Sequence, residues 1–164
     1  MEGKPNNAEG FYKSIKIGNF DELISEIVKI ISSNLTQTPN YTFALLSTKK
    51  DIEQHELPYV LNRIFSELRR TKVSFKQENI RISTVHTFKG EEADCVVLLD
   101  ASSKSFPPPP ILRATRRVLF GDTSISDMID AHCLFYVAIT RARHSLYFIY
   151  EGTQSSYLKM CGID

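Results

Sequence analysis

The sequence predicts an α/β domain in which a mostly parallel sheet carries helices on both faces. Segments with strand-like patterns alternate with segments of helical periodicity along most of the chain. The run Cys95-Val-Val-Leu-Leu99 is continuously apolar, which is typical of a strand covered on both faces. The length of 164 residues is that of one domain and leaves little room for a second.

The first predicted elements are a strand and a helix. Residues 11–17 alternate large apolar and polar side chains in part, which predicts a half-buried strand. Asn19 and Glu22 follow with the three-residue spacing of a capping box. Apolar side chains then recur at helical intervals, so we predict an amphipathic helix over residues 20–33.

The same patterns predict the remaining elements. The apolar run 41–46 predicts a buried strand, and Pro58 stands where the first turn of a second helix tolerates proline. Three further strands are predicted at residues 80–85, 95–99 and 146–150, and a third helix at residues 125–140. The four prolines Pro107–Pro110 must be extended, either as a stiff surface loop or as a segment that docks in an aromatic groove.

Composition excludes several classes of protein. Twenty basic residues against nineteen acidic ones leave a formal charge of +1, so no global basic field marks a nucleic-acid binder, although a local basic face stays open. The three cysteines include no CxxC pair, which excludes a zinc ribbon or a disulfide framework and favours a cytoplasmic protein. No apolar run approaches the ~18–20 residues of a membrane span. Residues 1–10 are predicted to be a flexible start without the apolar core of a signal peptide.

One chemically rich segment covers residues 82–100, which predict a strand, a polar turn and a second strand. The turn carries Thr84, His86, Lys89, Gly90 and Glu92. Polar groups at the C-terminal end of a buried parallel strand are where α/β sheets place ligand sites. The alternative is a solvated connection whose charges face water.

A second segment covers residues 134–143, an apolar helix that ends in Arg141 and Arg143 and is followed by His144. Arginines at a helix C-terminus often only complement the helix dipole. The functional alternative is a guanidinium that reaches a transferring phosphate, where its planar fork stabilises the spread negative charge.

Together these segments resemble two motifs of superfamily 1 helicases of the UvrD/Rep type. Thr84-Val-His-Thr-Phe-Lys-Gly-Glu-Glu92 resembles motif V, whose pattern is T-x-H-x-x-K-G-x-E, and Phe135-Tyr-Val-Ala-Ile-Thr-Arg-Ala-Arg143 resembles motif VI, typically Y-V-A-[LI]-T-R-A. Phe106-Pro107 and Phe120-Gly-Asp-Thr123, between the motifs, are similar to the helicase IV-like branch. The resemblance covers nearly the whole chain.

The resemblance implies a second RecA-like domain of a DNA motor, a P-loop NTPase-like parallel sheet flanked by helices. In that family the motif VI arginine, here Arg141, reaches across a cleft to the γ-phosphate of ATP. Glu92 is expected at the ribose, and Lys89 and Gly90 shape the turn. Arg143 matches a variable position and is treated as supporting only.

The resemblance also implies contacts with single-stranded DNA. Thr84 and His86 are expected on the single-strand track, where they would couple it to the nucleotide. Between the motifs lies a basic stretch without acidic residues that can supply salt-dependent phosphate contacts. Its arginines are Arg113, Arg116 and Arg117.

The departures limit what this chain can do alone. The only Gly-Lys pair, Gly3-Lys4, continues into Pro5, so the chain lacks the G-x-x-x-x-G-K-[ST] loop that holds phosphates. ATP and Mg²⁺ are therefore expected to be held mainly by a first RecA-like domain, with no metal site here. We expect residues 1–164 to form one monomeric domain, a fragment of a longer helicase that does not hydrolyse ATP by itself. The alternative is a non-catalytic RecA-like module for protein docking or regulation.

Overall fold

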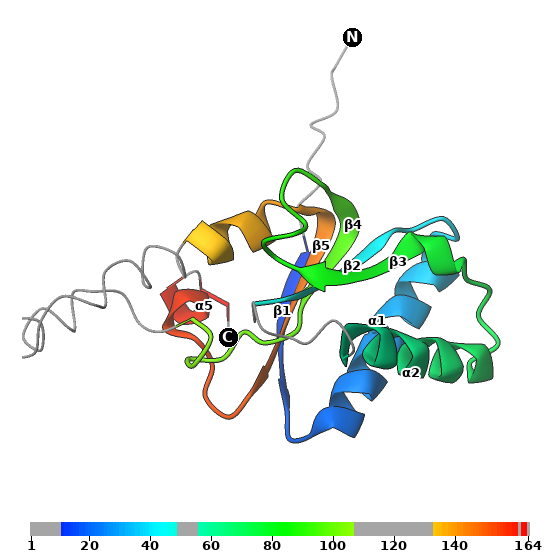
Figure 1. Ribbon diagram of the computed structural model, residues 1–164, viewed down its shortest axis with the longest axis horizontal. Helices are drawn as coiled ribbons and strands as arrows, with labels where there is room; N and C mark the ends of the chain where they lie inside the picture. Colours follow the sequence, from blue (N-terminus) through cyan, green and yellow to red (C-terminus); the bar gives the residue numbers. More distant parts are fainter. Residues whose placement is uncertain (1–10, 49–55, 107–132, 161, 164) are drawn as a thin grey trace, which may run out of the picture.

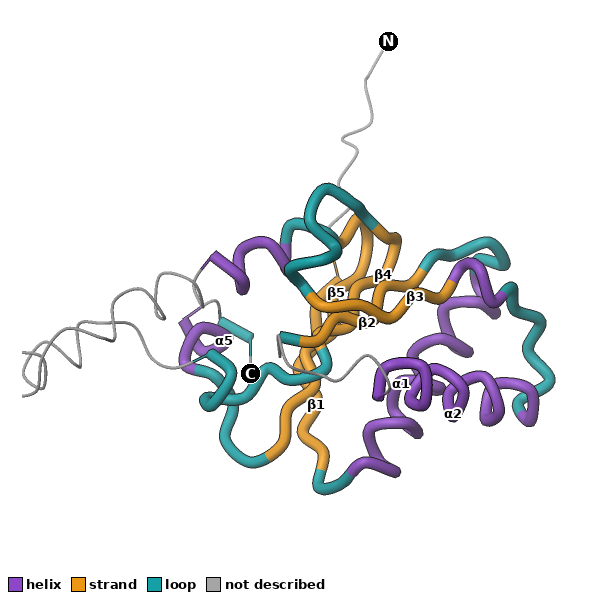
Figure 2. Tube along the Cα trace, in the orientation of Figure 1, coloured by secondary structure: helices purple, strands orange, loops and turns teal. Residues whose placement is uncertain are grey.

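The sheet has five strands that all run parallel. The computed structural model describes residues 11–48, 56–106, 133–160 and 162–163. The strands are β1 (Phe11–Ile17), β2 (Phe43–Ser47), β3 (Ile80–Thr84), β4 (Ala93–Leu98) and β5 (Ala142–Glu151). Their spatial order is β1-β5-β4-β2-β3, and every neighbouring pair is parallel (Figures 1 and 2). The predicted parallel α/β sheet is confirmed.

Two helices, α1 (Phe20–Gln37) and α2 (Glu56–Arg70), cover one face of the sheet (Figure 1). The capping box at the start of α1 is confirmed, because Glu22 N donates to Asn19 Oδ1 at 2.9 Å and Gly18 N donates to Glu22 Oε2 at 2.7 Å. The helix continues four residues past the predicted end because Leu35 extends its buried stripe.

The opposite face is covered by the turn at residues 85–90, by the helical residues 133–139 and by α5 (Ser156–Met160). Aromatic rings fill the space beneath them. Phe135 packs against Phe148 and Tyr157, with ring centroids 5.8 and 5.5 Å apart. These contacts hold residues 133–139, the described part of the helix predicted at 125–140, against β5.

Some element boundaries differ from the prediction. β5 begins at Ala142, four residues before the predicted Leu146, because the polar Arg143 and His144 continue the strand through a register shift opposite Asp94 and show no apolar pattern. The short helices α5 and η1 (Gln77–Asn79) were not predicted. Among the described residues, no helix combines the length and apolarity that crossing a membrane requires.

Several predicted features lie outside the described residues. They are the start at residues 1–10, the tetraproline run, the segment with Arg113, Arg116 and Arg117, the segment 120–123, and residues 125–132 of the predicted third helix.

Candidate functional site

The two chemically rich segments meet where β4 and β5 begin, which we call the amino edge of the sheet. Ala93 pairs with Ala142, so the residues just before these strands are neighbours in space. Ala93 N donates to the Arg141 carbonyl at 3.0 Å. Glu92 and Arg141 therefore lie side by side although 49 positions separate them in the sequence.

The polar turn crosses the sheet from one edge to the other. Thr84, at the end of β3, pairs with Ser47, whereas Cys95, near the start of β4, pairs with Phe43. These two partners are four positions apart on β2, about 13 Å at the rise of a parallel strand. The expectation that the polar groups gather at the carboxyl end of a strand is therefore wrong for Glu92.

Thr84, which is expected to bind nucleic acid, lies at that carboxyl end, and His86 follows it on the surface. The Thr84 hydroxyl shapes the turn, because it accepts from Thr87 N at 3.2 Å and lies 2.9 Å from Thr87 Oγ1. Phe88 N donates to the Thr84 carbonyl at 3.1 Å, which closes one helix-like turn.

The turn is anchored to the sheet by apolar side chains. Val85 and Phe88 are buried in the core on this face, while Lys89 is exposed. Gly90 has a φ of +90°, a conformation that costs a residue with a side chain about 1–2 kcal/mol. This glycine lets the chain reverse toward Glu92 and the start of β4.

The Arg141 guanidinium reaches across to this turn. Its Nη1 donates to the Glu91 carbonyl at 3.3 Å and its Nη2 donates to Thr140 Oγ1 at 3.3 Å. Its Nε is buried and has no hydrogen-bond partner among the described residues. The side chain thus bonds to the opposite segment rather than to the carbonyls of its own helix, which weakens the interpretation as a simple dipole complement.

Each of the two consecutive glutamates has its own arginine. The carboxylate of Glu91 pairs with Arg81 of β3. That of Glu92 accepts from Arg143 Nε at 3.1 Å. Sequence spacing did not indicate either pair, and Arg143, treated as supporting only, has a direct contact with the proposed ribose residue.

Asp94 completes the amino edge. Its Oδ2 accepts from Thr42 N at 2.9 Å and from Thr42 Oγ1 at 2.7 Å, while its own N donates to Thr42 Oγ1 at 3.0 Å. Its other oxygen, Oδ1, lies 3.8 Å from His144 Nε2 and 4.0 Å from Arg143 Nη1. The reciprocal bonds tie the start of β2 to β4 and hold a carboxylate beneath Arg143.

The side chains next to this edge, in the interior of the sheet, are shielded from solvent. Burial raises the pKa of the Cys95 thiol to about 12, although a hydrogen bond with Ser145 opposes the shift. Burial likewise raises the pKa of Tyr41, whose hydroxyl lies 3.4 Å from Ser145 Oγ. Both groups are therefore neutral near neutral pH, and the charged side chains of this edge are those nearer the surface.

The arrangement presents a half-buried guanidinium beside a half-exposed carboxylate. An arginine in this setting can bind an anionic group, and Glu92 Oε1, which makes no hydrogen bond to the described residues, can accept from a hydroxyl. No group of three or more His, Cys, Asp or Glu side chains in the described part of the chain could hold a metal ion.

Comparisons with known proteins point in one direction. The family described as UvrD-like helicase C-terminal domain matches residues 5–153. A crystal structure of the C-terminal domain of a possible DNA helicase from Lactobacillus plantarum WCFS1 has a similar fold, with a TM-score of 0.62 and 15% sequence identity. That similarity covers 93% of this chain and 82% of the other. A search of curated proteins found no match.

Proposed function

The chain belongs to the family of UvrD-like helicase C-terminal domains, and we propose that it is the second RecA-like motor domain of an ATP-dependent DNA helicase or translocase. Its domain is the whole of residues 1–164, and its first RecA-like domain lies in the same helicase. We assign it to the helicase IV-like branch on the segments around Phe106 and Phe120. As an isolated domain it is a cytoplasmic monomer.

The convergence of Arg141 with the turn before β4 carries this proposal. A guanidinium that fixed contacts hold in position can stabilise the charge of a transferring phosphate without reorganising first. Arg141 has such a contact, because its guanidinium donates to the Glu91 carbonyl at 3.3 Å. The described residues accept from Nη1 and Nη2 once each, so further N–H donors of the guanidinium remain for an incoming anion.

The same edge fits a nucleotide. In the proposed complex Arg141 contacts the γ-phosphate and Glu92 accepts hydroxyl groups of the ribose, while Lys89 and Gly90 keep the turn in shape. The nucleotide supplies the phosphate bond whose hydrolysis drives movement along DNA. Arg143 orients the Glu92 carboxylate through the 3.1 Å contact from its Nε. The first domain holds most of ATP and all of Mg²⁺.

Single-stranded DNA is the proposed second ligand. Thr84 and His86 lie at the other end of the same turn, so a shift of the turn on nucleotide binding would be transmitted to both of them. We propose that Arg113, Arg116 and Arg117 add phosphate contacts whose affinity falls steeply with salt.

The decisive experiment compares this chain alone with the same chain joined to a first RecA-like domain. DNA-stimulated release of phosphate from ATP is expected only from the joined protein, because only the first domain carries a P-loop. An upstream reading frame continuous with a G-x-x-x-x-G-K-[ST] motif would identify that domain. Hydrolysis by residues 1–164 alone, or an inactive joined protein that folds and binds ATP, would contradict the proposal.

A further inference from the structure

A second surface lies at the opposite edge of the sheet, where β1, β4 and β5 end, which we call the carboxyl edge. A groove of about 770 Å³ opens there between the start of α1, residues 99–105 and residues 151–153. Half-buried Leu23 and Leu99 form part of its lining, and the ring of Phe20 stands at its rim. None of these residues belongs to the site at the amino edge.

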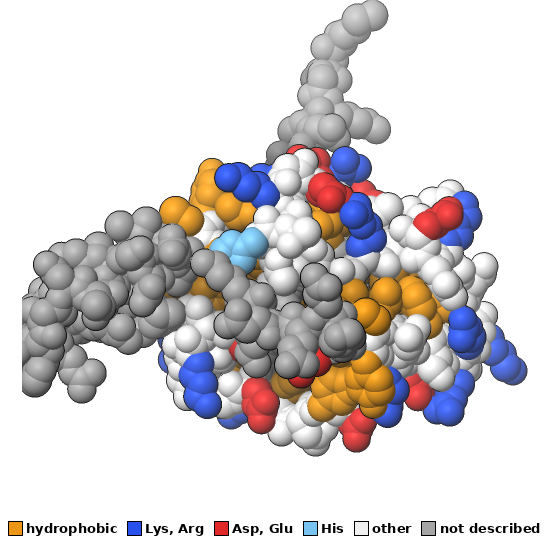
Figure 3. Space-filling model, viewed as in Figure 1, with side chains coloured by type: hydrophobic (Ala, Val, Ile, Leu, Met, Phe, Trp, Pro, Cys, Tyr) orange, Lys and Arg blue, Asp and Glu red, His pale blue; other side chains and the backbone are white. Residues whose placement is uncertain are grey.

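Two aromatic rings beside the groove are exposed and stacked on each other. Phe20 is 41% exposed and Tyr59 is 57% exposed. Their ring centroids are 6.3 Å apart and their planes differ by 17°. Figure 3 shows hydrophobic side chains gathered where α1 and α2 begin, with acidic side chains beside them. Two large exposed rings, one lining the groove and the other stacked on it, indicate a contact surface.

The charge around this surface is strongly unbalanced, although the whole chain carries only +1. We count the charged residues, among those that the structure describes, that line the groove or lie within one helical turn of the two rings on α1 and α2. Five are acidic and two are basic: Asp21, Glu22, Glu56, Asp100 and Glu151 against Arg63 and Lys104. A surface with this excess of carboxylates repels the phosphates of DNA and attracts cations.

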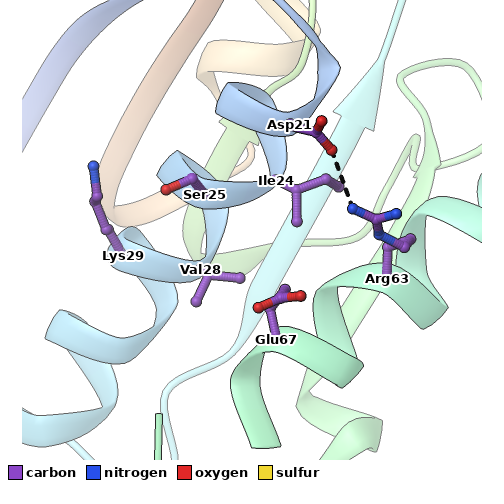
Figure 4. A pocket seen from close by; sticks show the side chains of 7 residues that line it. All are labelled: Asp21, Ile24, Ser25, Val28, Lys29, Arg63 and Glu67. Atoms are coloured by element: carbon purple, nitrogen blue, oxygen red, sulfur yellow. Dashed lines mark hydrogen bonds and ion pairs between the residues drawn. The ribbon is translucent and has the colours of Figure 1, made fainter. Parts of the chain in front are cut away.

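Within the described part of the chain, Asp21 is the one carboxylate of these five that has a cationic partner. Asp21 pairs with Arg63 at 3.1 Å across a neighbouring groove between α1 and α2 (Figure 4). That neighbouring groove has balanced charges, because Lys29 and Glu67 also line it. The carboxylates of Asp100 and Glu151, by contrast, form no ion pair within the described residues; Asp100 accepts from Ser105 Oγ and from Ser102 N.

We propose that the carboxyl-edge groove docks an arginine-containing peptide segment of another protein. A guanidinium satisfies both features of the surface, since it stacks on aromatic faces and pairs with carboxylates through its planar fork. An apolar neighbour of the arginine would enter the groove over Leu23 and Leu99. The docked segment leaves Arg141 and Glu92 uncovered, because the two edges are separated by the length of the strands.

The test uses residues 1–164 and a short fluorescent peptide in which arginines alternate with leucine and phenylalanine. Fluorescence anisotropy is expected to show saturable binding that weakens as salt rises. Tyr59→Ala should weaken it about tenfold, as truncation of an aromatic contact residue does. Glu151→Gln should weaken it about threefold. Lysine in place of arginine in the peptide should bind more weakly, because an ammonium group cannot stack as a guanidinium does.

The controls change residues of the same kind elsewhere. Tyr136, on the helix at residues 133–139, is 62% exposed, and Glu78 is exposed on η1. Tyr136→Ala and Glu78→Gln should leave peptide affinity unchanged, and circular dichroism should show that all variants are folded. Amide chemical shifts should change around Phe20, Ser103 and Glu151.

Several outcomes would overturn the proposal. They are equal losses in Tyr59→Ala and Tyr136→Ala, shift changes confined to the amino edge, and tighter binding of a thymidine oligonucleotide than of the peptide at this groove. Self-association of the chain that Tyr59→Ala abolishes would mean that a second copy occupies the surface instead. Each of these results leaves the proposed motor function untouched, because that function is read from phosphate release by the joined protein.

Discussion

The two edges of the sheet hold their carboxylates in different ways. At the amino edge Glu91 faces Arg81, Glu92 faces Arg143, and Asp94 lies near His144. At the carboxyl edge Asp100 and Glu151 have no cationic partner among the described residues. Paired charges keep a fixed geometry, as a site for a defined small ligand requires. Unpaired carboxylates beside exposed rings are available to pair with the cationic groups of a binding partner.

The largest effect should follow from removing the guanidinium at the amino edge. In a protein that joins this chain to a first RecA-like domain, Arg141→Ala should lower DNA-stimulated ATP hydrolysis by about 10³–10⁵. Arg141→Lys should rescue little, since an ammonium cannot reproduce the planar fork. Steady-state phosphate release measures both variants, and single-strand binding should persist.

The control for this prediction is Arg70, which pairs with Glu67 at 2.8 Å on the exposed side of α2. Arg70→Ala should leave hydrolysis unchanged. Arg143→Ala is unsuitable as a neutral control because it releases Glu92; it should mainly raise the KM for ATP. If Arg141→Ala and Arg70→Ala lose equal hydrolysis activity, or if Arg141→Ala unfolds, the role of Arg141 is structural.

The next effect concerns how firmly each edge is anchored to the core. Phe88 is 2% exposed, whereas Tyr59 at the carboxyl edge is 57% exposed. Phe88→Ala should lower the free energy of unfolding by about 3–5 kcal/mol, because a cavity forms under the turn. Tyr59→Ala should change it by no more than about 0.5 kcal/mol. Urea unfolding measures both, and a larger cost for Tyr59 would reverse the comparison.

Two glycines allow the edges to be compared under the same backbone strain. Gly90 has a φ of +90° at the amino edge, and Gly152 has a φ of +74° at the carboxyl edge. An added Cβ would meet no atom within 4 Å at either position, so the cost is conformational. Each change to alanine should lower stability by about 1–2 kcal/mol. Only Gly90→Ala should also slow hydrolysis by the joined protein; an equal slowing by Gly152→Ala would argue against a special role for the turn.

A further prediction concerns the burial of Cys95 beneath the amino edge. The pKa of Cys95 rises from 9.0 to about 12 on folding, so the unfolded thiol ionises first as pH increases. Its contribution to stability is complete below about pH 9 and is lost by about pH 12, at up to about 1.4 kcal/mol per pH unit. Urea unfolding from about pH 8 to about pH 10 should show this fall, and Cys95→Ala should reduce it.

Alkylation of the native chain near neutral pH is a second measurement of how well Cys95 is buried. The reagent should modify exposed Cys133 and spare buried Cys95. Modification of Cys95 at the same rate would show that the edge opens.

The sequence by itself determined the elements whose signals are local. β1 has the predicted bounds, Asn19 and Glu22 form the predicted capping box, and the alternation of strands and helices implied the parallel sheet. The two motif segments could also be recognised from the sequence, because their residue types follow one another at fixed spacing. These features depend on neighbours within a few positions, which is the range over which sequence patterns carry information.

Tertiary structure alone decided which charged residues meet. Glu92 and Arg143 are 51 positions apart, and they touch because β4 and β5 are adjacent in the sheet. The same strand order places Glu92 at the amino edge, opposite the expectation, because the turn runs back across the sheet to reach β4. The stacking of Phe20 on Tyr59 likewise follows from the packing of α1 beside α2. No spacing within the sequence encodes strand order, since that order is chosen by how all the apolar faces are buried together.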